Sequence, residues 1–166
     1  DASSTTHAKG LIISSAAIFY WNAQNNKTSF LSEFQSADNS MAGVRGTDAF
    51  SIESELKEGV EFYRSNQYSE SLLFFESSLE SDPENATAHY FIGLSALKLG
   101  ELDNAIENLS FARFNSENYY EDATWHLILA NIDKRNIEEA KALIKDLLKI
   151  EGGFYYDKAE KLSKEL

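Results

Sequence analysis

Hydrophobic residues recur at helical spacing through most of the chain, and short polar segments interrupt them at regular intervals. Residues three or four positions apart lie on one face of an α-helix, so such stripes predict helices that bury that face. Leu56, Val60 and Tyr63 form the first clear stripe, and Ser65-Asn66-Gln67 ends it. The pattern predicts an all-α fold with helices over the ranges 52–64, 68–81, 86–99, 102–114, 122–134, 137–150 and 154–166.

Turn-forming residues mark the corners between the predicted helices. Asp82-Pro83-Glu84-Asn85 separates two of them, because proline lacks the amide hydrogen that a helix interior needs. Gly100 stands just past the end of another helix, where a residue in the left-handed conformation commonly closes the last turn. At the corner Arg135-Asn136 we expect Asn136 to adopt that conformation, since asparagine tolerates it better than most residues.

The helices repeat with a period of 34 to 35 residues. Three pairs of residues lie 34 positions apart, namely Gly59 and Gly93, Tyr68 and Leu102, and Ser71 and Ala105. The last two positions recur 35 residues later as Ile137 and Ala140. The period predicts helical hairpins over about 52–85, 86–120 and 121–152, with small residues where helices cross closely: Gly59, Gly93, Ser71, Ala105, Ala112 and Ala140.

A single hairpin cannot bury its apolar face, so neighbouring hairpins are expected to stack. The segment 154–166 follows Gly152-Gly153 and has charged residues on most of its circumference. Its narrow apolar stripe consists of Phe154, Ala159, Leu162 and Leu166. This pattern predicts a helix that caps the stack and turns a polar face to water.

The repeat resembles the tetratricopeptide repeat family. The first unit supplies the family's characteristic positions as Gly59, Tyr68, Ser71, Phe75 and Pro83. The second unit supplies Gly93, Leu102, Ala105, Leu109 and Ala112, with Glu117 where the family has proline. The third unit supplies Ile137, Ala140 and Ile144, with Ile128 at a position that is usually small. The resemblance implies that residues 51–166 form a right-handed α-solenoid of about three hairpins plus the capping helix.

In this family the first helix of each hairpin lines a concave face that binds polypeptide segments. Carried over residue by residue, the resemblance places the following side chains in this groove: Leu56, Val60, Tyr63, Arg64, Tyr90, Leu94, Leu97, Lys98, Trp125, Leu129 and Ile132, with Glu53, Thr87, Asp122 and Asp133 beside them. Chaperone-binding members clamp a terminal carboxylate with lysine, asparagine and arginine, and this chain has Val60, Leu94 and Leu56 at those positions. The resemblance therefore implies a groove without that clamp.

An apolar groove suits an amphipathic helix or an extended apolar segment. The expected function is a non-enzymatic protein–protein interaction module. A competing interpretation is that Tyr63, Tyr90 and Trp125 belong to a covered core. The partner is then either another protein or the N-terminal part of the same chain.

Residues 1–50 are predicted to form an N-terminal extension with helical and irregular parts. The apolar run 11–21 is shorter than the roughly 20 residues that a membrane-spanning helix needs. It is either a packed helix or a piece of a longer membrane helix. Phe30, Leu31 and Phe34 follow at helical spacing, and polar turns lie between them and the repeats. We expect these apolar residues to pack on the repeats of the same chain or of a second copy.

The formal net charge of −12 is concentrated in the repeats. Residues 1–50 hold four acids and three bases, so the remaining residues hold 23 of the 27 acids and 12 of the 15 bases. Such a surface repels phosphate backbones, which argues against a nucleic acid partner. The acidic helix faces either keep the fold in solution or form a docking surface for a basic partner.

No constellation of residues for catalysis, a metal or a cofactor emerges from the sequence. The chain has no cysteine. His7, His89 and His126 lack the spacing of metal ligands, and the glycines do not form a phosphate-binding loop. We therefore expect no enzymatic activity, and we expect His89 and His126 to be structural.

The segment 122–166 also resembles the C-terminal half of small tetratricopeptide proteins from Bacteroidetes, many of which carry one membrane-spanning helix. This resemblance implies a bacterial protein in the cytoplasm or the cell envelope. An alternative function is a structural or assembly subunit, homo-oligomeric or membrane-associated through the run 11–21.

Overall fold

The computed structural model describes residues 56–166, which lie within one unit of the chain. The predictions for the extension 1–50, including the run 11–21 and Phe30, Leu31 and Phe34, lie outside the described residues, as does Glu53.

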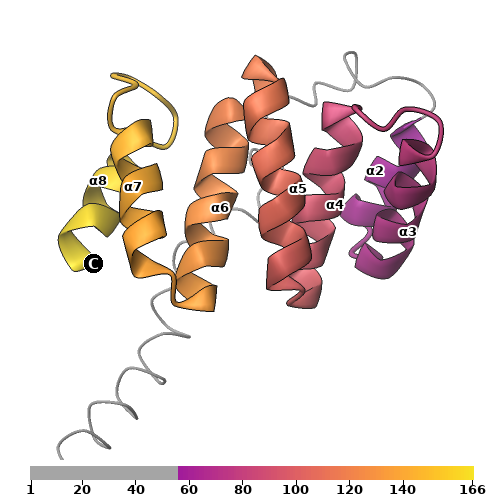
Figure 1. Ribbon diagram of the computed structural model, residues 1–166, viewed down its shortest axis with the longest axis horizontal. Coiled ribbons are helices and arrows are strands. Elements are labelled where there is room, and N and C mark those ends of the chain that lie inside the picture. The colour runs from indigo at the N-terminus through magenta and orange to yellow at the C-terminus, as the bar shows by residue number, and fades with distance from the viewer. Residues whose placement is uncertain (1–55) are drawn as a thin grey trace, which may run out of the picture. The chain divides into compact units, whose positions relative to one another are not determined.

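The described residues form antiparallel helical hairpins that stack in chain order (Figure 1). Each helix packs on the next, and the first helices of successive hairpins also touch. The elements are α2 (Lys57–Arg64), α3 (Tyr68–Leu79), α4 (Ala86–Leu99), α5 (Leu102–Asn115), η4 (Glu117–Tyr119), α6 (Tyr120–Lys134), α7 (Ile137–Leu147) and α8 (Tyr156–Glu165). The predicted all-α stack of hairpins with a final helix is confirmed.

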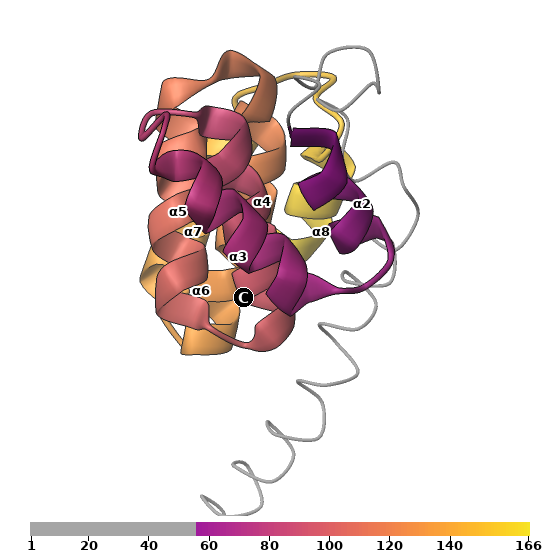
Figure 2. The ribbon, with the colours of Figure 1, turned by 90° about the vertical axis from the view of Figure 1, so that its right-hand side faces the viewer.

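Figure 2 shows α5 and α7 on one side of this stack and α2 and α8 on the other. The first helices of the hairpins are α2, α4 and α6, and the second helices are α3, α5 and α7.

The three turns inside the hairpins share one backbone conformation. Asn66, Gly100 and Arg135 have φ angles of 60°, 80° and 67° and therefore close α2, α4 and α6 in the left-handed conformation. The prediction that Asn136 takes this role is wrong, since its φ is −83° and it precedes α7. Asn66, Gly100 and Arg135 occupy the same position of the repeat, so the repeat register decides the corner even where the residue type disfavours it.

The predicted first helix begins at residue 52, outside the described residues, and α2 begins at Lys57. The other helix ends agree with the predicted ranges to within three residues, and differences of one or two residues are usual at helix termini. The prediction for α4 is met at both ends. The Asn85 side chain accepts a hydrogen bond from the Ala88 amide and so caps the first turn. The largest of these differences is at the end of α7, which stops at Leu147 and not at Ile150, whereas α6 begins at Tyr120 after a short 3₁₀ turn.

Close packing at the small residues is confirmed. Ser71, Ala105, Ala112 and Ala140 are fully buried, and Gly59 and Gly93 are buried as well. The Ser71 hydroxyl donates to the Gly59 carbonyl at 3.1 Å, and the Ser95 hydroxyl donates to Ser71 Oγ at 3.1 Å. These two bonds link α2, α3 and α4 where side chains are smallest.

The last helix caps the stack with a different aromatic residue from the one predicted. Tyr155 is 1% exposed and Phe154 is 41% exposed, so the assignment of Phe154 to the buried stripe is wrong. Ala159 and Leu162 are buried as predicted. Tyr155 lies four residues before Ala159 and shares its face, whereas Phe154 lies five residues before it.

Candidate functional site

The predicted groove residues lie on α2, α4 and α6, with Leu56 directly before α2. We call the surface that they form the first-helix face. Seven of the eleven side chains are buried, namely Leu56, Val60, Tyr90, Leu94, Trp125, Leu129 and Ile132. Tyr63 and Leu97 are half-buried, and Arg64 and Lys98 are exposed. The middle of this face is thus apolar and aromatic, and two cations lie at its edge.

Two of these helices are buried on every side. All residues from Tyr90 to Ala96 in α4 are buried, and so are all residues from Asp122 to Ile132 in α6. Successive residues of a helix point in directions about 100° apart, so an uninterrupted buried run includes every face. Tyr90 and Trp125 are therefore covered side chains, as the second interpretation of the sequence expected, whereas Tyr63 is only half covered.

Stacked aromatic pairs fix the two largest side chains of the first-helix face. Tyr90 stacks on Tyr119 with ring centroids 4.5 Å apart, and the Tyr119 hydroxyl donates to Thr87 Oγ1. Trp125 stacks on Tyr155 with centroids 5.2 Å apart. Stacked pairs of this kind contribute beyond the area that they bury. Tyr119 and Tyr155 were not among the residues predicted from the sequence, because both lie in connections between the repeat positions.

Helix α8 is attached to the start of α6 by polar contacts as well. The Tyr155 hydroxyl donates to Asp122 Oδ1 at 2.7 Å, and the Phe154 amide donates to Glu121 Oε2 at 3.0 Å. The Lys158 ammonium lies 5.6 Å from the Trp125 ring centroid and 5.2 Å from that of Tyr155. These distances permit cation–π attraction. The capping helix therefore holds one end of the first-helix face in place.

His89 and His126 have structural surroundings, as predicted, whereas His7 lies outside the described residues. His89 makes hydrogen-bond contacts to Asn108 Oδ1 at 2.7 Å and to the Pro83 carbonyl at 3.0 Å, and it stacks on Phe111. His126 is buried in α6. Within residues 56–166, no group of histidine, aspartate and glutamate side chains could hold a metal ion. No helix in this same range is long and apolar enough to cross a membrane.

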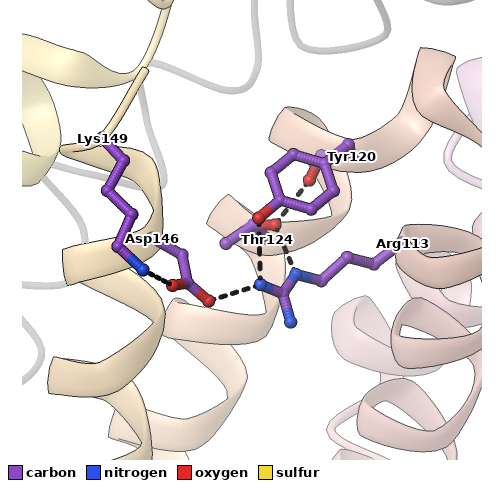
Figure 3. A network of polar contacts seen from close by, with 5 residues as sticks. All are labelled: Arg113, Tyr120, Thr124, Asp146 and Lys149. Carbon is purple, nitrogen blue, oxygen red and sulfur yellow. Dashed lines mark hydrogen bonds and ion pairs between the residues drawn. The ribbon is translucent and has the colours of Figure 1, made fainter. Parts of the chain in front are cut away.

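A polar network behind α6 fixes this helix between α5 and α7 (Figure 3). The Arg113 guanidinium donates to Asp146 Oδ2 at 2.6 Å and to Thr124 Oγ1 at 2.9 Å. It also lies 5.0 Å from the centroid of the Tyr120 ring. The Arg113 side chain is only 9% exposed, so this contact is better protected from water than a surface ion pair. Because α6 carries Trp125 and Leu129, the network indirectly positions the first-helix face.

The network lowers the pKa of the Asp146 carboxyl group. The hydrogen bond from Lys149 is the largest cause that lowers the pKa of Asp146 below its ordinary 3.8, and Arg113 adds to it against the opposing effect of burial. In turn, the hydrogen bond with Asp146 raises the pKa of Lys149. A carboxyl group with a lowered folded-state pKa stabilises the fold above its unfolded-state pKa, and this stabilisation is lost as pH falls through the folded-state value.

The substitution Asp146→Asn is expected to reduce the free energy of unfolding at pH 7 by about 1 kcal/mol, because Asp146 is partly exposed and keeps polar neighbours. The variant is also expected to lose part of the pH dependence of stability below about pH 4. Urea denaturation at several pH values measures both effects. Glu80→Gln, at an exposed acid, serves as the control. A parallel decline of wild type and Asp146→Asn with falling pH contradicts the assignment.

The comparisons with known proteins agree with this architecture. Residues 56–110, which run from the start of the first hairpin into α5 of the second, match the sequence model of the tetratricopeptide repeat family. This part of the chain carries tetratricopeptide repeats, and α6 to α8 continue the same stack of helical hairpins. Proteins of this family generally act as protein–protein interaction modules and are typically non-enzymatic scaffolds. A comparison with curated proteins gives no match.

Proposed function

We propose that the protein is an interaction module whose first-helix face holds an apolar polypeptide segment, either helical or extended. The observation that carries the proposal is the burial of α4 and α6 around their whole circumference. In a stack of two helical layers, the outer side of the first layer has no further layer of repeats to cover it. Leu94 and Leu129 are nevertheless only 2% and 1% exposed. A partner segment therefore reaches them only by replacing the groups that cover them, and these apolar side chains favour an apolar segment over water.

The sequence offers one occupant within the chain itself. The apolar residues of the predicted extension, in the run 11–21 and at Phe30, Leu31 and Phe34, are suited to an apolar face. We propose that this extension occupies the first-helix face in the absence of a partner and that an apolar segment of a partner protein displaces it. The displacement costs part of the partner's binding energy, which lowers its apparent affinity.

Two leucines of α4 provide a matched test in the full chain. Leu97 lies half-buried at the edge of the first-helix face, and Leu99 is 41% exposed on the same helix. Leu97→Glu places an unpaired carboxylate where the apolar segment is proposed to lie, which is unfavourable by more than about 1.4 kcal/mol. Leu99→Glu introduces the same charge two residues away.

Trypsin cleavage at Lys27 and Arg45, followed by mass spectrometry, reads out how often the extension leaves the repeats. We expect Leu97→Glu to accelerate this cleavage about tenfold and Leu99→Glu to leave it near the wild-type rate. Equal cleavage rates in all three proteins, with unchanged melting temperatures, would argue against an occupied first-helix face.

A second candidate function is a structural or assembly subunit, which the apolar run 11–21 favours. In this case the extension contacts a second copy or a membrane surface. The mass of the particle in solution separates this candidate from the first, since only an assembly subunit forms a dimer or larger particle through its extension.

A further inference from the structure

The second helices α3 and α5 carry a surface that neither the hairpin packing nor the first-helix face uses. On each helix, residues three to four positions apart form a line that points away from the stack. We call these lines the outward stripes. They consist of Ser69, Leu73, Glu76 and Glu80 on α3, and of Asp103, Glu107, Ser110 and Phe114 on α5. Seven of these eight residues are exposed, and Ser110 is half-buried.

The outward stripes contain the two most exposed large apolar side chains within residues 56–166. Leu73 is 65% exposed and Phe114 is 75% exposed. The 34-residue period places Leu73 at the position of Glu107 in the next unit, and Glu80 at the position of Phe114. Each apolar side chain of one stripe therefore has an acidic side chain at the equivalent position of the other stripe.

The charge of this surface has one sign. From Ser65 to Ala112 the chain has eight acids (Glu70, Glu76, Glu80, Asp82, Glu84, Glu101, Asp103, Glu107) and a single base, Lys98. Lys98 belongs to α4 and not to the outward stripes. Asp103 forms an ion pair with Lys134, whereas Glu76, Glu80 and Glu107 have no ion pair within the described part of the chain.

The next second helix shows that this imbalance is not a general property of the fold. The corresponding outward positions of the third hairpin include Lys145 on α7 and Lys149 just after this helix, and both are exposed. The helix also carries Lys141 and the acids Glu138, Glu139 and Asp146, so its charges nearly balance. The base Arg113 of α5 lies 5.0 Å from the Phe114 ring, but its side chain is 9% exposed and paired with Asp146. Mixed charges are sufficient to solvate α7, so solvation alone does not explain why the exposed charges on α3 and α5 all have one sign.

We propose that the outward stripes of α3 and α5 bind a basic amphipathic helix of a partner protein. Lysine or arginine side chains of this helix pair with Glu76, Glu80 and Glu107, and apolar residues between them cover Leu73 and Phe114. Charge complementarity selects this occupant, because neither nucleic acid nor an anionic membrane is attracted to unpaired carboxylates. The outward stripes are a second docking surface, separate from the first-helix face.

The test uses the full chain and a fluorescein-labelled peptide of about 18 residues with lysine and leucine at helical spacing. Fluorescence anisotropy is measured at about 0.15 M salt, where distant charges are largely screened. We expect saturable binding. The double substitutions Leu73→Ser with Phe114→Ser and Glu76→Lys with Glu107→Lys are each expected to weaken this binding at least tenfold. All four positions are exposed, so the variants are expected to keep the wild-type circular dichroism spectrum.

Two controls separate binding at the outward stripes from a general effect of charge and from binding at the first-helix face. Glu151→Lys with Glu165→Lys makes the same change in net charge at exposed positions near the C-terminus, and we expect it to change the affinity less than twofold. Leu97→Glu is expected to leave the affinity unchanged, since Leu97 belongs to the first-helix face. Absence of saturable binding, equal weakening by the distant charge reversal, or a loss produced only by Leu97→Glu would each overturn the proposal.

Discussion

Replacing Phe75 by alanine is expected to lower the free energy of unfolding by about 3–5 kcal/mol, the usual range for truncating a fully buried aromatic side chain. Phe75 is 0% exposed. Its ring stacks on that of Phe91 with centroids 5.1 Å apart and meets the ring of Phe74 edge to face. Phe75 lies on α3 and Phe91 on α4, so this pair joins the first hairpin to the second.

The truncation leaves a cavity that its surroundings cannot fill easily. A Cβ atom on Gly59 would lie only 2.8 Å from the Phe75 ring, which shows how closely α2 approaches α3 here. A loss of about 3–5 kcal/mol is a large part of the 5–15 kcal/mol that stabilises a typical domain. In a stack with nearest-neighbour coupling, the first hairpin is expected to unfold before the rest.

Urea denaturation followed by circular dichroism measures the effect, and Phe114→Ala is the matched control. Phe114 has the same side chain but is 75% exposed, so its truncation is expected to change stability by about 0.5 kcal/mol or less. Similar losses for the two substitutions would contradict the packing assigned to Phe75.

The substitution Gly93→Val is expected to destabilise the protein by about 3 kcal/mol through overpacking where α4 crosses α5. A Cβ atom at Gly93 would lie 2.6 Å from Leu109 Cγ and 3.0 Å from the Leu109 backbone nitrogen. A side chain can rotate away from such a clash, but the backbone of a packed helix cannot move without shifting its neighbours.

Helix propensity alone would give a different result at Gly93. Valine is slightly more favourable than glycine inside a helix, so a substitution without a clash would be neutral or stabilising. Lys98→Val, at an exposed position of the same helix, provides that comparison. Thermal denaturation of both variants, and of Gly93→Val combined with Leu109→Ala, measures the coupling between positions 93 and 109. A stability of Gly93→Val equal to that of Lys98→Val would refute the close crossing.

The sequence predicted the elements well where local and repeat signals agree. Helix α4 begins and ends as predicted because Asn85 caps its start and Gly100 closes its end. The signals disagree at Arg135-Asn136, where residue preference pointed to Asn136 and the repeat register placed the left-handed residue at Arg135. The register prevails there because packing of α6 against α7 is worth more than one unfavourable φ angle.

The sequence predicted which helices carry the candidate site residues, but it did not predict how exposed these residues are. The family pattern placed residues such as Tyr90, Leu94 and Trp125 on the first helices, and they lie there. Their complete burial did not follow from periodicity, because exposure depends on what lies across the face. Arg113 and Asp146 are 33 residues apart in the sequence, and their contact depends on the long arginine side chain. No local sequence pattern therefore predicts this contact.

The first-helix face and the outward stripes are two unlike surfaces. The first-helix face is apolar and aromatic, and the outward stripes of α3 and α5 are acidic with two exposed apolar side chains. A hydrophobic partner segment and a basic partner helix would therefore not compete for one surface. Partners of the two surfaces would be affected by different conditions, since only the electrostatic contact weakens strongly with salt.

The most direct measurement is the light-scattering mass of the full chain compared with that of a chain lacking residues 1–50, each with an apolar fluorescent dye. If the extension occupies the first-helix face, we expect a monomeric full chain with low dye fluorescence. The shortened chain is then expected to bind the dye and to self-associate through its uncovered first-helix face. A dimeric full chain that becomes monomeric on shortening would favour the assembly subunit. Two soluble monomers with equally low dye fluorescence would contradict the claim that the first-helix face holds an apolar segment.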